Sequence, residues 1–335
     1  MTDASNEKQA LSFFITGALT GAGRALTRYL VKRGHQVTGV VPSSLEAAEL
    51  YRSDGGLPCY CDPDDAGCFR SMMAMAKADV VVHLGVTDYN APPSVTPKQY
   101  EAGSLTRQAE AVMEAAGKVG AKRVIYASFA FLYGSTGKMS AAEAAPLTHE
   151  HLAFVHDALH AEQAILDGGV PGYVLRTGYL YGATDPLQTL RQKLLNGSAV
   201  PGGDKVAPWL HVDDLAQAVA LIGERQLEDE GVDTVYNLAA THITPSEFVE
   251  RFAQVAGFAA PRFASGPLAT WRQSELQRWL LTLETRITSD KIEEELGWKP
   301  RYEDVAEGLD QALLIWRAEE DVDTSNAPKE AEAAQ

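Results

Sequence analysis

The sequence has no apolar run long enough to cross a membrane. Its longest apolar stretches, such as Leu11–Ile15 and Val80–Val82, have the length of a β-strand. The segment Met1–Glu7 is polar and lacks the apolar centre of a signal peptide. These absences predict a cytoplasmic protein without a membrane partner.

Positive charge is also scarce, with 29 Lys and Arg against 45 Asp and Glu and a formal net charge of −16. A field of that sign repels nucleic acids and anionic lipid surfaces, so no nucleic-acid partner is expected. Part of the excess lies in residues 318–335, which read as a disordered acidic tail.

Cysteine is rare, and all three residues lie close together at Cys59, Cys61 and Cys68. A zinc site would need a fourth ligand, and an odd count argues against a disulfide framework. We therefore expect small buried thiols in a reducing compartment and no metal site.

What the chain does have is a regular alternation of strand-like and helix-like segments. The expected strands are Ser12–Thr16, Gln36–Val41, Leu57–Cys61, Asp79–Leu84, Arg123–Ser128 and Tyr173–Thr177. Helices are expected after the first strand and over about Pro97–Val119 and Glu150–Leu166. This order predicts an α/β fold with a doubly wound parallel Rossmann sheet.

The alternation breaks down after Gly178 and predicts a smaller, mostly helical lobe that covers the carboxyl edge of the strands. We expect a Rossmann domain over 11–177, with returning segments at about 206–240. The expected lobe comprises 178–205 and 241–317.

A glycine cluster connects the first strand to the first helix. Glycine permits the tight turn and lets a pyrophosphate approach the backbone at the helix amino end. Strand, turn and helix follow in the required order, so we expect a dinucleotide to bind Gly17, Thr20, Gly21, Ala22 and Gly23.

The second strand ends in Val40–Ser44 without the acid that usually binds the ribose 2′-hydroxyl of NAD. Hydroxyls of Ser43 and Ser44 can bind a 2′-phosphate, and Arg24 can add positive charge. NADP(H) is therefore favoured over NAD(H).

Six separated motifs stand in one order along the chain: Cys61–Asp65, Val81–Gly85, Ser128–Gly134, Leu175–Gly182, His211–Ala216 and Leu296–Pro300. From about residue 11 to 317 the chain resembles the extended short-chain dehydrogenases/reductases, in the branch of NAD-dependent epimerases and dehydratases. One departure is Thr20, where the extended branch has glycine. The resemblance implies that the dinucleotide also contacts Asp62, Pro63, His83, Leu84, Gly85, Ser128, Gly178 and Leu180.

The larger departures concern catalysis. In this family a tyrosine exchanges a proton with the substrate oxygen, assisted by a lysine four residues later and by a hydroxyl on the fifth strand. The matching positions here are Phe154, Ala158 and Phe129. None of the twelve tyrosines has a lysine four residues downstream, so the pair is absent in any alignment.

Three other residues are candidates for the missing chemistry, although a structural or solvated role is the more common one for such residues. Ser128 retains a hydroxyl on the fifth strand, His151 lies three residues before Phe154, and Tyr89 follows the fourth strand. On a helix His151 would share the face of Phe154. The histidines at 149, 151, 156 and 160 point to different faces of that helix and do not form a metal cluster.

The leading hypothesis is a diverged oxidoreductase or epimerase/isomerase for a small apolar or neutral substrate. Phe129, Phe154 and Trp209 would line its pocket, and the segment Lys205–Trp209 lacks the arginine that nucleotide-sugar enzymes of this family use for the diphosphate. One alternative is a non-catalytic NADP(H)-binding sensor or assembly protein, and another is a cofactor-independent isomerase or cyclase. The resemblance also implies a homodimer that pairs through the two long helices.

Overall fold

Seven parallel strands form the central sheet of the protein. The computed structural model describes residues 10–62, 64–84, 90–92, 100–148, 151–225, 235–264 and 273–326. The strand order is β3-β2-β1-β4-β5-β6-β9, and every pairing within this sheet is parallel. The strands are β1 Ser12–Thr16, β2 Gln36–Val40, β3 Leu57–Cys59, β4 Val80–His83, β5 Arg123–Phe129, β6 Gly172–Thr177 and β9 Val235–Leu238.

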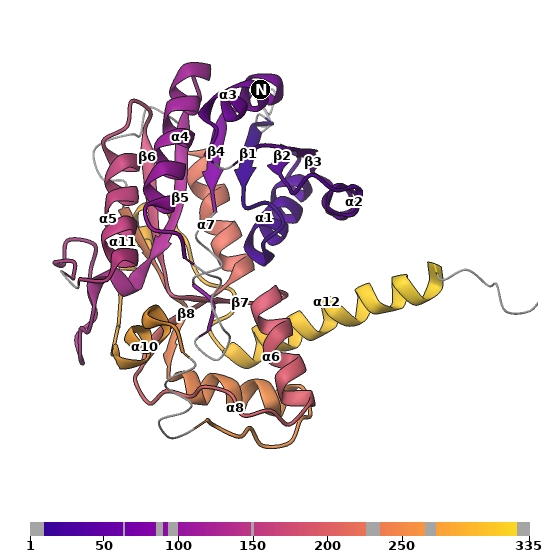
Figure 1. Ribbon diagram of the computed structural model, residues 1–335, viewed down its shortest axis with the longest axis vertical. Coiled ribbons are helices and arrows are strands. Elements are labelled where there is room, and N and C mark those ends of the chain that lie inside the picture. The colour runs from indigo at the N-terminus through magenta and orange to yellow at the C-terminus, as the bar shows by residue number, and fades with distance from the viewer. Residues whose placement is uncertain are drawn as a thin grey trace, which may run out of the picture.

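Helices cover both faces of this sheet, as Figure 1 shows. On one face lie α3 Ala66–Ala76, α4 Ser104–Val119 and α5 Ala153–Leu166. The other face carries α1 Gly21–Lys32, α2 Leu45–Ser53 and α7 Val212–Glu224. Strands β1 and β4 are buried throughout because both faces are covered, which accounts for their continuous apolar sequence. The predicted doubly wound fold is confirmed.

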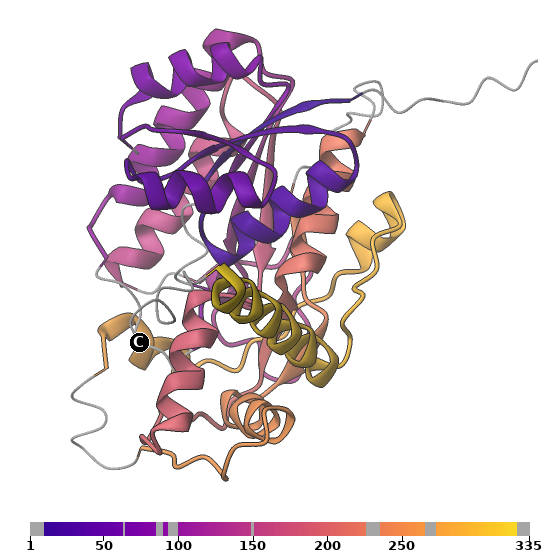
Figure 2. The same cartoon turned by 90° about the vertical axis from the view of Figure 1, so that its right-hand side faces the viewer.

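A second group of elements lies at the carboxyl end of the large sheet, below it in both Figure 1 and Figure 2. Its small sheet has the order β10-β8-β7, formed by Thr241–Ile243, Ala207–His211 and Tyr179–Tyr181. Its helices are α6 Asp185–Leu195, α8 Pro245–Val255, α10 Glu275–Thr282 and α12 Val305–Asn326, whereas α11 Asp290–Leu296 packs beside β9 of the large sheet. Helix α12 extends into the stretch that the sequence predicted as a tail from residue 318. None of the described helices has the length and apolar character that a membrane span requires.

Helix α4 receives its amino-terminal cap from another helix. Its own N-cap residue is Gly103, which has no side chain to offer. Instead the Asp157 carboxylate on α5 accepts hydrogen bonds from the backbone N–H groups of Leu105 and Thr106, both at 3.0 Å. Asp157 also accepts the hydroxyl proton of Tyr100 at 2.8 Å. Burial acts to raise the pKa of Asp157, but these hydrogen bonds outweigh it and hold the pKa below its ordinary value.

Candidate functional site

The glycine turn between β1 and α1 is the most tightly built part of the site. Gly17 has φ +69°, a backbone conformation that glycine adopts without strain. A Cβ atom on Gly23 would lie 2.3 Å from the carbonyl oxygen of Gly17, so a larger residue cannot occupy that position undisturbed. The turn and the first turn of α1 therefore pack backbone against backbone.

Thr20, which stands where the resemblance led us to expect a glycine, closes this turn with its side chain. Its hydroxyl donates to the carbonyl oxygen of Gly17 at 2.8 Å and accepts from the N–H of Gly23 at 3.1 Å. The hydroxyl is thus the N-cap of α1. The N–H groups of Gly21 and Ala22 belong to the first turn, where a helix offers no internal partner. These two amides and the positive end of the helix dipole suit a pyrophosphate.

A small pocket lies at this helix end, between the large sheet and the second lobe. Its lining includes Thr20, Gly21, Ala22, Leu180, Thr184 and Val212. Gly21 meets the second lobe closely here, since a Cβ atom on it would lie 2.4 Å from Cγ2 of Thr184. Thr184 is the N-cap of α6. The amino ends of α1 and α6 therefore meet where the phosphates of a dinucleotide would lie, and the turn fits such a group.

Sequence reasoning did not find Thr184 or the pocket residue Val212. The pattern Thr184-Asp185-Pro186 is a helix-start signal and marks the beginning of α6. Its contact with Gly21 is a tertiary feature without a local signal.

The candidate residues for the adenosine end sit at the carboxyl ends of β2, β3 and β4. Ser43 is exposed, and the hydroxyl of Ser44 caps α2 by accepting from the N–H of Ala47 at 3.1 Å. Asp62 is exposed and accepts from the N–H of Asp64 at 3.0 Å. Pro63 lies outside the described residues.

Arg24 forms salt bridges with two acidic residues of the protein. Its guanidinium lies 2.7 Å from the Asp54 carboxylate and 3.2 Å from the Glu319 carboxylate of α12. Burial tends to lower the pKa of Arg24, but these acids raise it above its ordinary value. A 2′-phosphate would have to compete with both acids for this cation.

His83, at the end of β4, ties two strands together. Its Nδ1 lies 2.6 Å from the Thr16 hydroxyl at the end of β1, and its ring stacks on Tyr126 of β5. Burial lowers the pKa of His83 to about 4, so the imidazole is neutral at pH 7. Leu84 is buried next to it, whereas Gly85 and Tyr89 lie outside the described residues.

Gly178 and Leu180 lie where β6 leads into β7. A Cβ atom on Gly178 would come within 2.3 Å of the carbonyl oxygen of Pro208, so the backbones of the two lobes touch there. The Leu180 side chain lines the pocket beside Gly21, while its N–H donates to the carbonyl oxygen of Asn90 at 2.8 Å. Asn90, which the sequence analysis did not single out, is fully buried and donates to the Thr177 hydroxyl at 2.8 Å.

Aromatic rings meet at the positions where the resemblance led us to expect a tyrosine and a hydroxyl. Phe129 and Phe154 meet edge to face with centroids 5.0 Å apart, and Tyr100 contacts Phe154 at 5.2 Å. Ala158 is completely buried one helical turn after Phe154. The predicted third ring, Trp209, packs elsewhere, stacked on Phe248 at 3.9 Å.

Ser128 belongs to a buried ion-pair network. Its hydroxyl donates to Glu162 at 2.5 Å, and Glu162 forms a salt bridge of 2.7 Å with Arg176. Arg176 also donates to the Tyr133 hydroxyl at 2.8 Å. Burial alone would lower the pKa of Arg176, but the hydrogen bonds and charge of Glu162 raise it. The hydroxyl of Ser128 thus serves the structure of the sheet in this state.

His151 is not on the helix where the sequence placed it. Helix α5 begins at Ala153 after the N-cap Leu152, so His151 precedes the helix and is exposed. His156 and His160 are exposed on α5, and no metal-binding cluster occurs among the residues that the structure describes.

The cysteines also differ from expectation. Cys61 and Cys68 form a disulfide, and only Cys59 is a buried free thiol among the described residues. An odd number of cysteines argued against a framework of several bridges, but it does not prevent one local pair. Residues that follow an edge strand and begin the next helix can approach without crossing the core.

A parallel sheet with a glycine turn at its first helix defines a Rossmann-type dinucleotide-binding architecture. The model of the NAD dependent epimerase/dehydratase family matches residues 13–239, and the chain belongs to this family. A Streptomyces protein named 3-diazoavenalumate denitrifying reductase is 27% identical over 308 residues, which cover 88% of this chain and 98% of that protein.

Solved structures of the same architecture confirm the fold. The Bordetella bronchiseptica enzyme WbmG in complex with NAD superposes with a TM-score of 0.69 at 18% identity, covering 94% of this chain and 96% of that one. UDP-glucose 4-epimerase of Thermotoga maritima gives a TM-score of 0.70 at 18% identity, covering 92% and 99%.

Proposed function

We propose that the protein is an NADP(H)-dependent oxidoreductase for a small apolar or neutral substrate, and that its reaction needs no proton from the usual tyrosine. The observation that carries the proposal is the contrast between the two ends of the site. The glycine turn suits a pyrophosphate, while Phe129, Phe154 and Ala158 occupy the positions that the resemblance assigns to the catalytic hydroxyl, tyrosine and lysine. The bound dinucleotide would supply a hydride.

The identity of the hydride acceptor follows from the missing acid. Hydride addition to a carbonyl creates an alkoxide that must be protonated, and the family tyrosine performs that step. Replacement of a diazo group on an aromatic ring by hydride expels N₂ and leaves no oxyanion. The name of the Streptomyces relative gives a diazo compound as its substrate. We therefore favour an electron-poor acceptor of this kind, bound near the rings of Phe129 and Phe154.

The preference for NADP(H) rests on the end of β2. No acid follows Val40 within four residues, and exposed Ser43 has a hydroxyl to offer to a 2′-phosphate. Arg24 is the cation that we propose for the 2′-phosphate, although it already forms salt bridges with Asp54 and Glu319. Glu319→Gln should therefore tighten NADPH binding by a few fold and leave NADH binding almost unchanged. Equal effects on both nucleotides would contradict this role of Arg24.

Two measurements test the proposal. Fluorescence titration of the purified protein with NADPH and NADH should give tighter binding of NADPH. Single-turnover oxidation of deuterated NADPH should then transfer the label to an aryl diazonium salt faster than to a panel of ketones and aldehydes. Faster transfer to carbonyls, or tighter NADH binding, would refute the corresponding part of the proposal.

A non-catalytic dinucleotide sensor is the second candidate, because the hydroxyl of Ser128 is also taken up by Glu162. Tight NADPH binding without label transfer to any acceptor would favour the sensor. In either case we propose a homodimer paired through α4 and α5, which a sedimentation measurement at micromolar concentration would test.

A further inference from the structure

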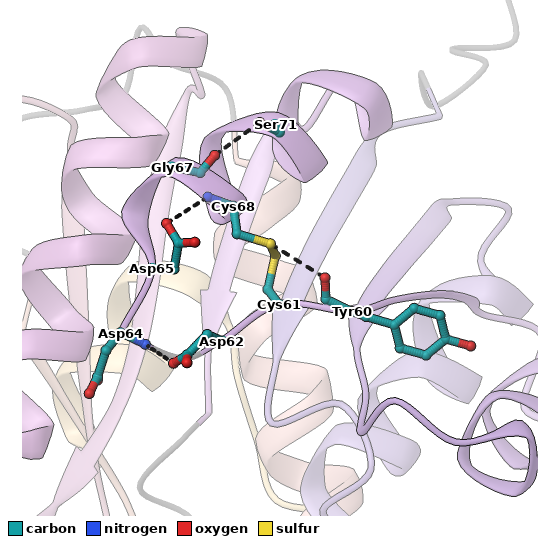
Figure 3. The surroundings of a disulfide bond; sticks show 8 residues. All are labelled: Tyr60, Cys61, Asp62, Asp64, Asp65, Gly67, Cys68 and Ser71. Carbon is teal, nitrogen blue, oxygen red and sulfur yellow. Dashed lines mark hydrogen bonds between the residues drawn. A yellow bond between two sulfur atoms is a disulfide. The ribbon is translucent and has the colours of Figure 1, made fainter.

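The disulfide between Cys61 and Cys68 spans the segment that joins β3 to α3, as Figure 3 shows. Cys61 follows the last strand at one edge of the large sheet, and Cys68 lies in the first turn of α3. Both residues are partly exposed. A thiol in solution can therefore reach this bond without unfolding the core.

The bridged segment contains Asp62, a candidate residue for the adenosine end of the dinucleotide. Asp62 follows Cys61 directly, and its carboxylate accepts from the N–H of Asp64. Asp65 then caps α3 by accepting from the N–H of Cys68 at 3.0 Å. The bridge thus holds Asp62 between a fixed strand end and a fixed helix start.

The surroundings of the two sulfurs favour reversible exchange. Cys68 lies at the amino end of α3, where the helix dipole stabilises the negative charge of a departing thiolate. Its Sγ lies 3.4 Å from the carbonyl oxygen of Tyr60, an acceptor for the S–H group once the bond is reduced. Burial raises the pKa of the third thiol, Cys59, to about 12, which keeps it protonated and outside the exchange.

We propose that Cys61–Cys68 is a thiol-exchangeable site that controls dinucleotide affinity by ordering the loop around Asp62. A dithiol reduces the bond in two exchange steps. Its first thiolate attacks the Cys61 sulfur and releases the Cys68 thiolate, which the amino end of α3 stabilises. Its second thiol then displaces the remaining cysteine as the dithiol closes its own disulfide. The two cysteines end as thiols, and the same electrons return when an oxidised dithiol reforms the bridge.

Reduction of the disulfide should affect the loop between Cys61 and Cys68 more than it affects the fold. The bridge closes only the short segment from Cys61 to Cys68, which lies at the sheet edge, where Cys61 and Ala66 pack only partly buried against the core. Reduction should increase the mobility of this segment and leave β1, β4 and β5 unchanged. The link to affinity rests on the proposed function, because it assumes that a dinucleotide binds beside Asp62.

The experiment equilibrates the full chain with reduced or oxidised dithiothreitol and counts free thiols by alkylation and mass spectrometry. Amide hydrogen exchange over residues 60–70 and the Kd for NADPH are measured in both states. We expect two additional alkylated thiols, at least tenfold faster exchange in this segment, and a three- to tenfold weaker Kd after reduction. Reoxidation should restore both readouts.

Controls separate the bridge from other effects. The double variant Cys61→Ser with Cys68→Ser should resemble the reduced protein under both conditions, whereas Cys59→Ala should retain the full response. Failure of the bond to form under oxidised dithiothreitol would overturn the proposal, as would equal hydrogen exchange in both states. Equal Kd values with altered exchange would overturn the control of affinity. If NADPH binds in neither state, the proposed function fails, and the hydrogen exchange still decides whether the bond is a reversible switch.

Discussion

Phe154 packs its ring edge-on against Phe129, so two apolar side chains meet at positions that the family resemblance assigns to a tyrosine and a hydroxyl. The pair is buried, and Tyr100 contacts Phe154 from a second side. The Tyr100 hydroxyl donates a hydrogen bond to the Asp157 carboxylate at 2.8 Å. Under the proposed function, packing of these rings takes the place of the acid–base pair.

The first prediction concerns this aromatic pair. Phe154→Ala and Phe129→Ala should each lower the free energy of unfolding by about 3–5 kcal/mol, because each leaves a cavity in the core. Urea unfolding of the wild type, both single variants and the double variant gives a double-mutant cycle. Its coupling energy should be about 0.5–1.5 kcal/mol, as expected for an edge-to-face pair. A coupling near zero would mean that the rings do not interact.

The second prediction concerns the glycine turn. Gly23→Ala forces a Cβ atom against the carbonyl oxygen of Gly17 and should weaken dinucleotide binding by at least tenfold. The matched control is Gly117→Ala on α4, where the nearest atom is 3.8 Å from the new Cβ. That variant should bind normally and gain up to about 1 kcal/mol of stability from its higher helix propensity. Undiminished binding by Gly23→Ala would contradict the proposed pyrophosphate site.

The third prediction concerns the buried salt bridge. Glu162→Gln would leave the Arg176 guanidinium buried without its counter-charge and should destabilise the protein by about 3–5 kcal/mol. Thermal unfolding of this variant can be compared with Glu110→Gln on the exposed side of α4, which should change stability by less than about 0.5 kcal/mol. Equal melting temperatures would show that the pair contributes little.

The fourth prediction is a pH dependence. Burial lowers the pKa of His83 to about 4, whereas the unfolded chain has the ordinary value of about 6.5. Between these values the unfolded state binds a proton that the folded state excludes. The free energy of unfolding should therefore fall as the pH falls from about 6.5 to 4, by up to about 3 kcal/mol from this group.

His83→Asn should reduce the slope of stability against pH in that window, and the exposed His160→Asn should leave the slope unchanged. His211 and His242 also have lowered pKa values because of burial, so some slope should remain. An unchanged slope in His83→Asn would show that this histidine titrates normally in the folded protein.

The sequence predicted the parallel sheet and the position of the glycine turn because both depend on local patterns. Continuous apolar residues such as Val80–Val82 mark a strand buried on both faces, and Gly17 must sit at a strand-to-helix turn. The contact between Gly21 and Thr184 had no such pattern, since it joins two segments that meet only after folding. The disulfide was missed for another reason: the odd number of cysteines was taken to argue against bridges, although it does not prevent one local pair. His151 was misplaced because a helix start is set by capping, and the predicted boundary was three residues too early.

The cap that Asp157 provides joins two helices electrostatically as well as by packing. Fraying of α5 as far as Asp157 would leave the amino end of α4 without its cap. Unwinding of α4 would leave the buried Asp157 carboxylate without these two N–H donors. Neither helix can open alone at low cost. The two should therefore exchange their amide protons as a single cooperative unit.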